Sequence, residues 1–162
     1  MPENKSTIII DYAHTPDAYE KVLNTVQKMK PKHSKVNVFF GCGGDRDKGK
    51  RAEMGQIAST GADKIFITDD NPRTEDAASI RAAIISACPN AVEIASRDKA
   101  IAAALSSIGS GDVLLIAGKG HETVQLVGNE SLPFDDAAIA SHLMMQMHIQ
   151  RLHHIPHFVF YC

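Results

Sequence analysis

The sequence predicts an α/β fold in which a mostly parallel sheet carries helices on both of its faces. Short apolar runs alternate with amphipathic segments over the first 135 residues, and this alternation favours parallel strands joined by right-handed helical crossovers. The chain has 162 residues, of which 44% are hydrophobic and 22% are charged. That length and composition are typical of one globular domain with its own core.

The first half of the chain predicts three strands and two helices. Residues 6–12 (STIIIDY) form a buried apolar run, and Thr15 and Pro16 then have the residue types of a helix cap and a first helical position. The helix that follows has Ala18, Val22, Leu23, Val26 and Met29 at helical spacing. Residues 35–40 (KVNVFF) and 64–68 (KIFIT) predict the next two strands, with a helix over 51–59 between them.

The second half continues the pattern as far as residue 136. A helix is expected over residues 79–88, a weaker strand over 92–95, an alanine-rich helix over 98–108 and a fifth strand over 113–117 (VLLIA). Residues 137–162 differ, because residues 139–162 hold five of the eight histidines and three of the six methionines. We therefore predict a domain over 1–136 and an atypical tail over 137–162, helical in its first half and stopped by Pro156.

Charge and cysteine content exclude several classes of protein. The net charge is −2 and the pI is about 6.4, so no basic field favours nucleic acid or an anionic membrane as a partner. No run of about 18 apolar residues suggests a membrane span. Cys42, Cys88 and Cys162 are odd in number and far apart, which favours a reducing compartment and hence the cytosol.

Four polar loops follow predicted strands, at residues 11–16, 41–51, 69–73 and 118–122. Ligands of open parallel sheets bind beyond the carboxyl ends of the strands. We therefore expect a binding site at the edge where these four loops meet.

The second of these loops is close to a phosphate-binding loop but does not match one. Gly44, Gly49 and Lys50 fit the pattern, whereas Arg51 stands where Ser or Thr would hold magnesium. Asp45 and Asp47 also place negative charge where phosphates would lie. Arg46 remains a candidate to bind a carboxylate or phosphate, with Lys48 as a second cation; the alternative is a solvated turn with salt bridges.

The other loops suggest a ligand that carries both charges. Arg73 suits a carboxylate, while Asp70 and Asn71 suit an ammonium group, and Pro72 stiffens the loop. The alternative for that loop is an Asx turn that starts the next helix. Glu122 could bind a second ammonium or be merely exposed.

The first loop offers candidates for a nucleotide. His14 could contact a base or phosphate, or only stabilise its turn; Asp11 could bind a ribose hydroxyl or cap the next helix. No metal site is expected: residues 121–125 (HETVQ) lack the second histidine of a zinc protease motif, and the histidines at 148, 153, 154 and 157 have no cysteine partner at zinc-finger spacing.

Four strings in this order, DYAHTP (11–16), GCGGDRDKGKR (41–51), DNPR (70–73) and GKGHE (118–122), resemble the C-terminal domain of the Mur ligases, and within that family the ligases that add diaminopimelate. The resemblance extends from about residue 6 to residue 136. It implies a Rossmann-like fold and an ATP-dependent amide ligase of peptidoglycan synthesis. In such an enzyme ATP phosphorylates the side-chain carboxylate of D-Glu in UDP-MurNAc-L-Ala-D-Glu, and the amino group of meso-diaminopimelate attacks the resulting acyl phosphate and releases phosphate.

The resemblance also implies which residues bind each ligand, and it assigns no catalytic residue to this chain. The amino-acid pocket would consist of Arg46, Asp70, Asn71, Pro72, Arg73, Gly118 and Glu122. The side that faces the nucleotide would consist of Asp11, Tyr12, His14, Asp45 and Lys48. ATP and Mg²⁺ are the implied cofactors, and most of their site would belong to a central domain.

The resemblance covers only one of the three domains of a complete ligase. The domain that holds the UDP-sugar and the central domain with its phosphate loop have no counterpart among its 162 residues. We therefore expect a fragment that is inactive alone. Two alternatives stay open, namely an inert fragment or stand-alone binding module, and a relative that adds lysine.

Overall fold

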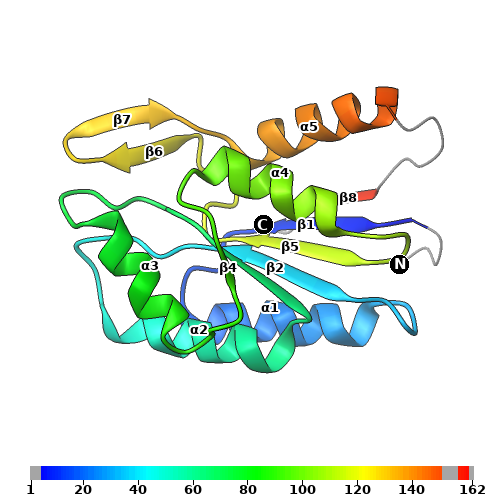
Figure 1. Ribbon diagram of the computed structural model, residues 1–162, viewed down its shortest axis with the longest axis horizontal. Coiled ribbons are helices and arrows are strands. Elements are labelled where there is room, and N and C mark those ends of the chain that lie inside the picture. The colour runs from blue at the N-terminus through cyan, green and yellow to red at the C-terminus, as the bar shows by residue number, and fades with distance from the viewer. Residues whose placement is uncertain (1–4, 151–156, 161–162) are drawn as a thin grey trace.

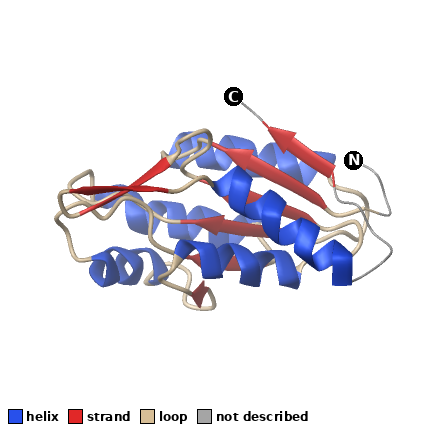
Figure 2. Ribbon diagram, turned by 90° about the horizontal axis from the view of Figure 1, so that it is seen from above, coloured by secondary structure: helices blue, strands red, loops and turns tan. Residues whose placement is uncertain are grey.

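A six-stranded parallel sheet forms the centre of the molecule and helices cover both of its faces (Figure 1, Figure 2). The computed structural model describes residues 5–150 and 157–160. The sheet has the order β4-β3-β2-β5-β1-β8. Its strands, in chain order, are β1 (Thr7–Asp11), β2 (Val36–Phe40), β3 (Lys64–Ile67), β4 (Val92–Glu93), β5 (Val113–Ala117) and β8 (His157–Phe160). The remaining elements are the helices α1 (Pro16–Met29), α2 (Gly49–Gly61), α3 (Ala77–Ile85), α4 (Arg97–Ser107) and α5 (Asp136–Gln150), and an antiparallel hairpin of β6 (Val124–Val127) and β7 (Glu130–Pro133).

The strand order explains why the helices divide between the two faces. From β1 to β4 the chain advances across the sheet in one direction, and α1, α2 and α3 pack on the same face. It then reverses through α4 to place β5 between β2 and β1. A right-handed crossover in the reverse direction must pass over the opposite face, and α4 and α5 lie there (Figure 1). The predicted fold class is thus confirmed.

Each face of the sheet has its own apolar core. Tyr19, Leu23 and Met54 pack with strand residues such as Phe40 on the α1–α3 face. Phe39, which points the other way because side chains alternate along a strand, packs with residues of α4 and α5 on the opposite face. The five residues of β5 are all buried, as expected for a strand covered on both sides.

The first helix begins as the sequence predicts. Thr15 is its N-cap, with the hydroxyl accepting a hydrogen bond of 3.3 Å from the backbone nitrogen of Ala18, and Pro16 is its first residue. Other boundaries differ by a few residues. The predicted strand at 92–95 shortens to the two residues of β4, which lies at the sheet edge and pairs only with β3 among the described strands.

The β6–β7 hairpin and the edge strand β8 were not predicted. Every residue of β7 is exposed and β6 is at most half-buried, so neither strand shows the apolar alternation by which a half-buried strand is recognised. β8 pairs in parallel with β1, with Thr7 opposite His157.

The first half of the predicted tail is helical, as expected. Helix α5 starts at Asp136, and its Ala140 and Met144 belong to the core of the α4 face. Pro156, which was expected to stop this helix, lies outside the described residues. The domain boundary after residue 136 stays a prediction.

A buried ion pair joins α4 to the start of α5. The Arg97 guanidinium donates to the Asp136 carboxylate at 2.8 and 2.6 Å, and neither side chain is exposed. Arg97 also donates to the backbone oxygens of Asp69 and Ala117. This one side chain therefore holds together the carboxyl ends of β3 and β5.

None of the described helices is both long and apolar enough to cross a membrane.

Candidate functional site

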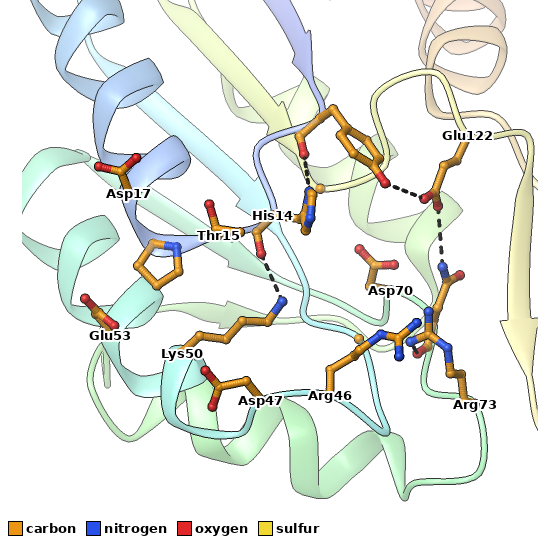
Figure 3. Close-up of a pocket in the computed structure, with 15 residues that line it drawn as sticks. His14, Thr15, Asp17, Arg46, Asp47, Lys50, Glu53, Asp70, Arg73 and Glu122 are labelled. Atoms are coloured by element: carbon orange, nitrogen blue, oxygen red, sulfur yellow. Dashed lines mark hydrogen bonds between the residues drawn. The ribbon is translucent and has the colours of Figure 1, made fainter.

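A pocket of about 700 Å³ opens at the carboxyl edge of the sheet (Figure 3). Its walls come from the loops after β1, β2, β3 and β5 and from the first turns of α1 and α2. The lining residues are Tyr12, His14, Thr15, Pro16, Asp17, Gly43, Arg46, Asp47, Lys50, Glu53, Asp70, Asn71, Arg73, Gly118 and Glu122.

The strand order accounts for the position of this pocket. The chain leaves β1 and β2 toward the α1–α3 face, whereas it leaves β5, which lies between them, toward α5 on the opposite face. Connections that diverge in this way open a crevice at the ends of the strands.

At the end of β1 and in the loop after it, most polar groups take part in local hydrogen bonds. The Asp11 carboxylate accepts from the backbone nitrogen of Ala13 at 2.7 Å, and the helix cap is Thr15 rather than Asp11. Nδ1 of His14 lies 2.8 Å from the Tyr12 carbonyl oxygen. The Tyr12 ring packs edge-on against His14, and its hydroxyl donates to Glu122 at 3.3 Å. Burial, and then the Glu122 charge and hydrogen bond, raise the pKa of that hydroxyl.

The loop after β2 is locked to the segment that starts α3. Arg51, almost fully buried, donates to both carboxylate oxygens of Glu75 at 2.8 Å. Those bonds, followed by one from the Asp45 backbone nitrogen, lower the pKa of Glu75 to about 2. Asp45 in turn accepts from the backbone and hydroxyl of Thr74.

Two donors at the start of α2 that a phosphate-binding loop would offer are already engaged. The backbone nitrogen at the start of α2, that of Gly49, already donates to the Asp47 carboxylate at 2.9 Å. Arg51 is committed to Glu75. The structure therefore agrees with the absence of a phosphate-binding loop here.

Two guanidinium groups converge at one end of the pocket (Figure 3). Nη1 of Arg73 donates to the carbonyl oxygen of Gly44 at 2.8 Å and to that of Asn71 at 3.4 Å. Within the described part of the chain, Nε and Nη2 of Arg73 and the whole guanidinium of Arg46 have no protein partner. Two like charges facing one space, with free donors, form a site for an anion such as a carboxylate.

Opposite these cations lie two carboxylates, Asp70 and Glu122 (Figure 3). Asp70 is nearly buried and Glu122 is half-buried. Nδ2 of Asn71 donates to Glu122 at 3.4 Å. Buried behind both acids, the ammonium of Lys119 lies 3.7 Å from Asp70 and 3.6 Å from Glu122.

Two glycines permit the close approach of these loops. Gly118 has a φ of +112°, and a Cβ there would lie 2.9 Å from the Asp70 carboxylate. A Cβ at Gly44 would lie only 1.9 Å from the carbonyl oxygen of Pro72. Any side chain at either position would push the loops apart.

The β6–β7 hairpin is fastened along the loop after β3. The backbone nitrogen of Arg73 donates to the carbonyl oxygen of Leu126 at 3.1 Å, and the backbone nitrogen of Gly128 donates to the carbonyl oxygen of Arg73 at 2.6 Å. Gln125 donates to the backbone oxygen of Asp70 at 2.6 Å. The hairpin thus fixes the backbone from which Arg73 reaches the pocket, where Arg73 adopts a φ of +53°.

The structure brings eight of the twelve predicted site residues to the pocket wall, namely Tyr12, His14, Arg46, Asp70, Asn71, Arg73, Gly118 and Glu122. Pro72 is buried in the loop beside them. Asp11, Asp45 and Lys48 do not line the pocket; the ammonium of Lys48 lies 3.5 Å from Glu75. The binding role of each residue stays a prediction.

Sequence reasoning missed Lys119 and the acidic end of the pocket, formed by Asp17, Asp47 and Glu53 beside Lys50. The GKGHE string contains Lys119, but nothing in it shows that the side chain turns inward. Among the residues with described side chains, no group of three or more His, Cys, Asp or Glu could hold a metal ion. Histidines 148, 153, 154 and 157 have no described side chains.

Comparison with known proteins gives the same family. Residues 1–120 match the model of the Mur ligase, glutamate ligase domain. The UDP-N-acetylmuramoyl-L-alanyl-D-glutamate–2,6-diaminopimelate ligase of Rickettsia felis is 53% identical over 141 residues, which are 86% of this chain and 27% of that protein. The ligase of the same name from Mesorhizobium japonicum is 52% identical over 129 residues, or 80% of this chain and 26% of that protein. The chain thus spans little more than a quarter of these relatives.

Solved structures extend the likeness to the fold. A structure of a UDP-N-acetylmuramoyl-L-alanyl-D-glutamate–2,6-diaminopimelate ligase matches with a TM-score of 0.83 and 37% identity, over 91% of this chain and 31% of that one. Escherichia coli FolC in complex with ADP matches with a TM-score of 0.53 and 20% identity, over 89% of this chain and 30% of that one, which supports the fold alone. With the family model covering its first 120 residues and this architecture around its pocket, the chain belongs to the Mur ligase family.

Proposed function

We propose that this chain forms the amino-acid-binding part of an ATP-dependent amide ligase that adds meso-diaminopimelate to UDP-MurNAc-L-Ala-D-Glu in peptidoglycan synthesis. The observation that carries the proposal is the pairing, within one pocket, of the guanidinium groups of Arg46 and Arg73 with the carboxylates of Asp70 and Glu122. The names of the relatives, which are about half identical to this chain, support the same substrate.

This arrangement complements one amino-acid end of diaminopimelate. The free edge of Arg73 and the unpaired Arg46 would bind its carboxylate, while Asp70 and Glu122 would bind its ammonium group. When lysine presents its α-amino group as the nucleophile, the end in this pocket has an ammonium but no carboxylate and would leave the two cations unpaired. Loss of one charged, hydrogen-bonded pair costs on the order of 2–5 kcal/mol, enough to discriminate between the two amino acids.

The contribution of this chain to the reaction would be orientation of the nucleophile. With one end of diaminopimelate held by four charged side chains, the amino group at the other end can be presented to an activated carboxylate held elsewhere in a full-length ligase. Fixing two reactants in this way converts a bimolecular step into an effectively unimolecular one. No side chain of this chain needs to form a covalent bond.

ATP supplies the activation of the carboxylate in such a ligase, but two donors that the loop after β2 would offer to its phosphates, the Gly49 nitrogen and the Arg51 guanidinium, are already engaged. Of the residues predicted to face the nucleotide, Tyr12 and His14 line the pocket and remain available to it. We therefore assign the phosphates and Mg²⁺ to other parts of a full-length ligase. A cytosolic location is proposed from the two buried free thiols, Cys42 and Cys88.

Calorimetric titration of the chain with meso-diaminopimelate and with L-lysine tests this proposal. We expect binding of diaminopimelate alone. Arg73→Ala should weaken that binding at least tenfold, whereas Lys99→Met, a change at an exposed lysine on α4, should leave it unaltered.

Other outcomes would select the alternatives. Equal binding of both amino acids, or an unchanged preference in Arg73→Ala, would refute the assigned specificity and favour a lysine-adding relative. Absence of binding by a chain shown to be folded would favour an inert fragment.

A further inference from the structure

We propose that Lys119 is the positioning residue for the ammonium-binding side of the pocket, an inference that rests on the proposed function and extends it. Lys119 does not line the pocket and its side chain is fully buried. It acts on the ligand through the residues in front of it.

The Lys119 ammonium contacts each residue expected to bind the ammonium of the substrate. It donates to Oδ1 of Asn71 at 2.8 Å and lies 3.7 Å from Asp70 and 3.6 Å from Glu122. Another hydrogen bond of 2.8 Å, to the backbone oxygen of Val124, ties it to the β6–β7 hairpin. One buried cation therefore connects the loop after β3, the loop after β5 and the hairpin.

The first consequence concerns the orientation of the Asn71 amide. Its Oδ1 accepts from Lys119 and, at 2.9 Å, from the backbone nitrogen of Leu126. With the oxygen fixed by two donors, the amide nitrogen must point the other way, where it donates to Glu122 at 3.4 Å. Lys119 and the Leu126 backbone nitrogen together thus set how Asn71 holds Glu122.

The second consequence concerns charge. Two carboxylates that open into one pocket repel each other, and a nearby cation favours their ionised forms. The distances from Lys119 to Asp70 and Glu122 exceed 3.5 Å, which is too long for hydrogen bonds. Lys119 therefore offsets the repulsion without itself donating a hydrogen bond to either carboxylate.

Other charged and titratable groups also face this pair of carboxylates. The Tyr12 hydroxyl and the Arg97 guanidinium interact electrostatically with both, and the Cys42 thiol interacts with Asp70. Arg46 and Arg73 lie across the pocket (Figure 3). Because none of these changes when Lys119 is replaced, the effect of Lys119 can be measured separately.

The test compares Lys119→Met, which keeps the length of the side chain and removes its charge, with Lys99→Met as the matched control. In the ligand-free chain, ¹³C NMR follows the carboxyl signals of Asp70 and Glu122 against pH. Because a cation 3.6–3.7 Å away is removed, we expect both signals to titrate at higher pH in Lys119→Met than in the wild type, and at an unchanged pH in Lys99→Met. Unchanged midpoints in a folded Lys119→Met would overturn the proposal.

A second measurement uses meso-diaminopimelate. Its affinity should fall by about tenfold in Lys119→Met at pH 8, and by a larger factor at pH 5, because the cation that favours the ionised carboxylates is gone. The same factor at both pH values would mean that Lys119 acts only on structure. If the wild-type chain binds no diaminopimelate, the proposed function fails while the NMR titration still decides the role of Lys119.

A further variant keeps the proposal testable if Lys119→Met fails to fold. If Lys119→Met does not fold, Lys119→Met/Glu122→Gln removes one carboxylate charge together with the cation. Recovery of folding by the double variant supports the charge role. Failure of both variants would show that Lys119 serves folding through Val124, and would overturn the positioning role.

Discussion

Replacement of Asp136 by Asn should destabilise the protein severely. The change removes the directly contacting counter-charge of Arg97, whose guanidinium is fully buried and donates two short hydrogen bonds, 2.8 and 2.6 Å, to the Asp136 carboxylate. The other groups in contact with Arg97 are the carbonyl oxygens of Asp69 and Ala117, at 3.3 and 3.4 Å, and the face of the Phe39 ring, at 4.8 Å; the Asp70 and Glu122 carboxylates act on it without an ion-pair contact. None of these contacting groups neutralises the charge.

The magnitude follows from the burial of both partners. Breaking a buried ion pair by removing one charge costs about 3–5 kcal/mol, out of a total stability of about 5–15 kcal/mol for a typical domain. For a domain of this length each kcal/mol corresponds to roughly 2–4 °C in Tm. We therefore expect Asp136→Asn to lower the Tm by about 6–20 °C.

Urea unfolding followed by circular dichroism measures this effect. The double variant Arg97→Met/Asp136→Leu serves as the control, because it replaces the pair by apolar side chains and should recover most of the loss. A folded Asp136→Asn within about 1 kcal/mol of the wild type would refute the reasoning. It would mean that solvent or another group reaches Arg97.

Three further changes test other parts of the structure. Gly118→Ala should weaken diaminopimelate binding at least tenfold by calorimetry, because its Cβ would lie 2.9 Å from the Asp70 carboxylate at a φ of +112°; unchanged affinity would contradict this. Thr15→Ala should lower the free energy of unfolding by about 1 kcal/mol through loss of the α1 cap, whereas Thr15→Ser should not. Glu75, whose pKa is lowered to about 2 by Arg51, contributes stability that is complete above its unfolded pKa of 4.5 and is lost as the pH falls toward 2. The loss of unfolding free energy between pH 5 and 2 should therefore be smaller in Glu75→Gln than in the wild type. An equal loss in both proteins, measured by denaturant titration at each pH, would refute that.

The elements that could be predicted from the sequence are those whose residue types are compatible with only one local structure. Pro16 after Thr15 has few roles other than the start of a helix, and the apolar run at 113–117 can be satisfied only by burial on both faces. The four polar loops could be placed at one edge because parallel strands end at the same edge. The fold class and the location of the pocket follow from those features.

Features that depend on distant contacts were not predictable. β6 and β7 bury too little surface to leave a pattern, and they are held by bonds to residues about 50 positions earlier, such as that from Leu126 to Asn71. Lys119 appears in the sequence as one more charged loop residue, although its side chain is fully buried. Lys48 is a further case, because the sequence does not show that its side chain lies outside the pocket lining, with its ammonium 3.5 Å from Glu75.

The place of β1 in the sheet has a consequence for how the protein reaches its native state. Its described partners are β5 and β8, with Thr7 opposite Val113 on one side and His157 on the other. On the ribosome, this strand of three consecutive isoleucines must therefore wait until most of the chain has been synthesised. Such distant pairing slows folding, because a long loop must close before any contact forms. During that interval β1 exposes apolar side chains and unpaired backbone groups, a combination that favours aggregation.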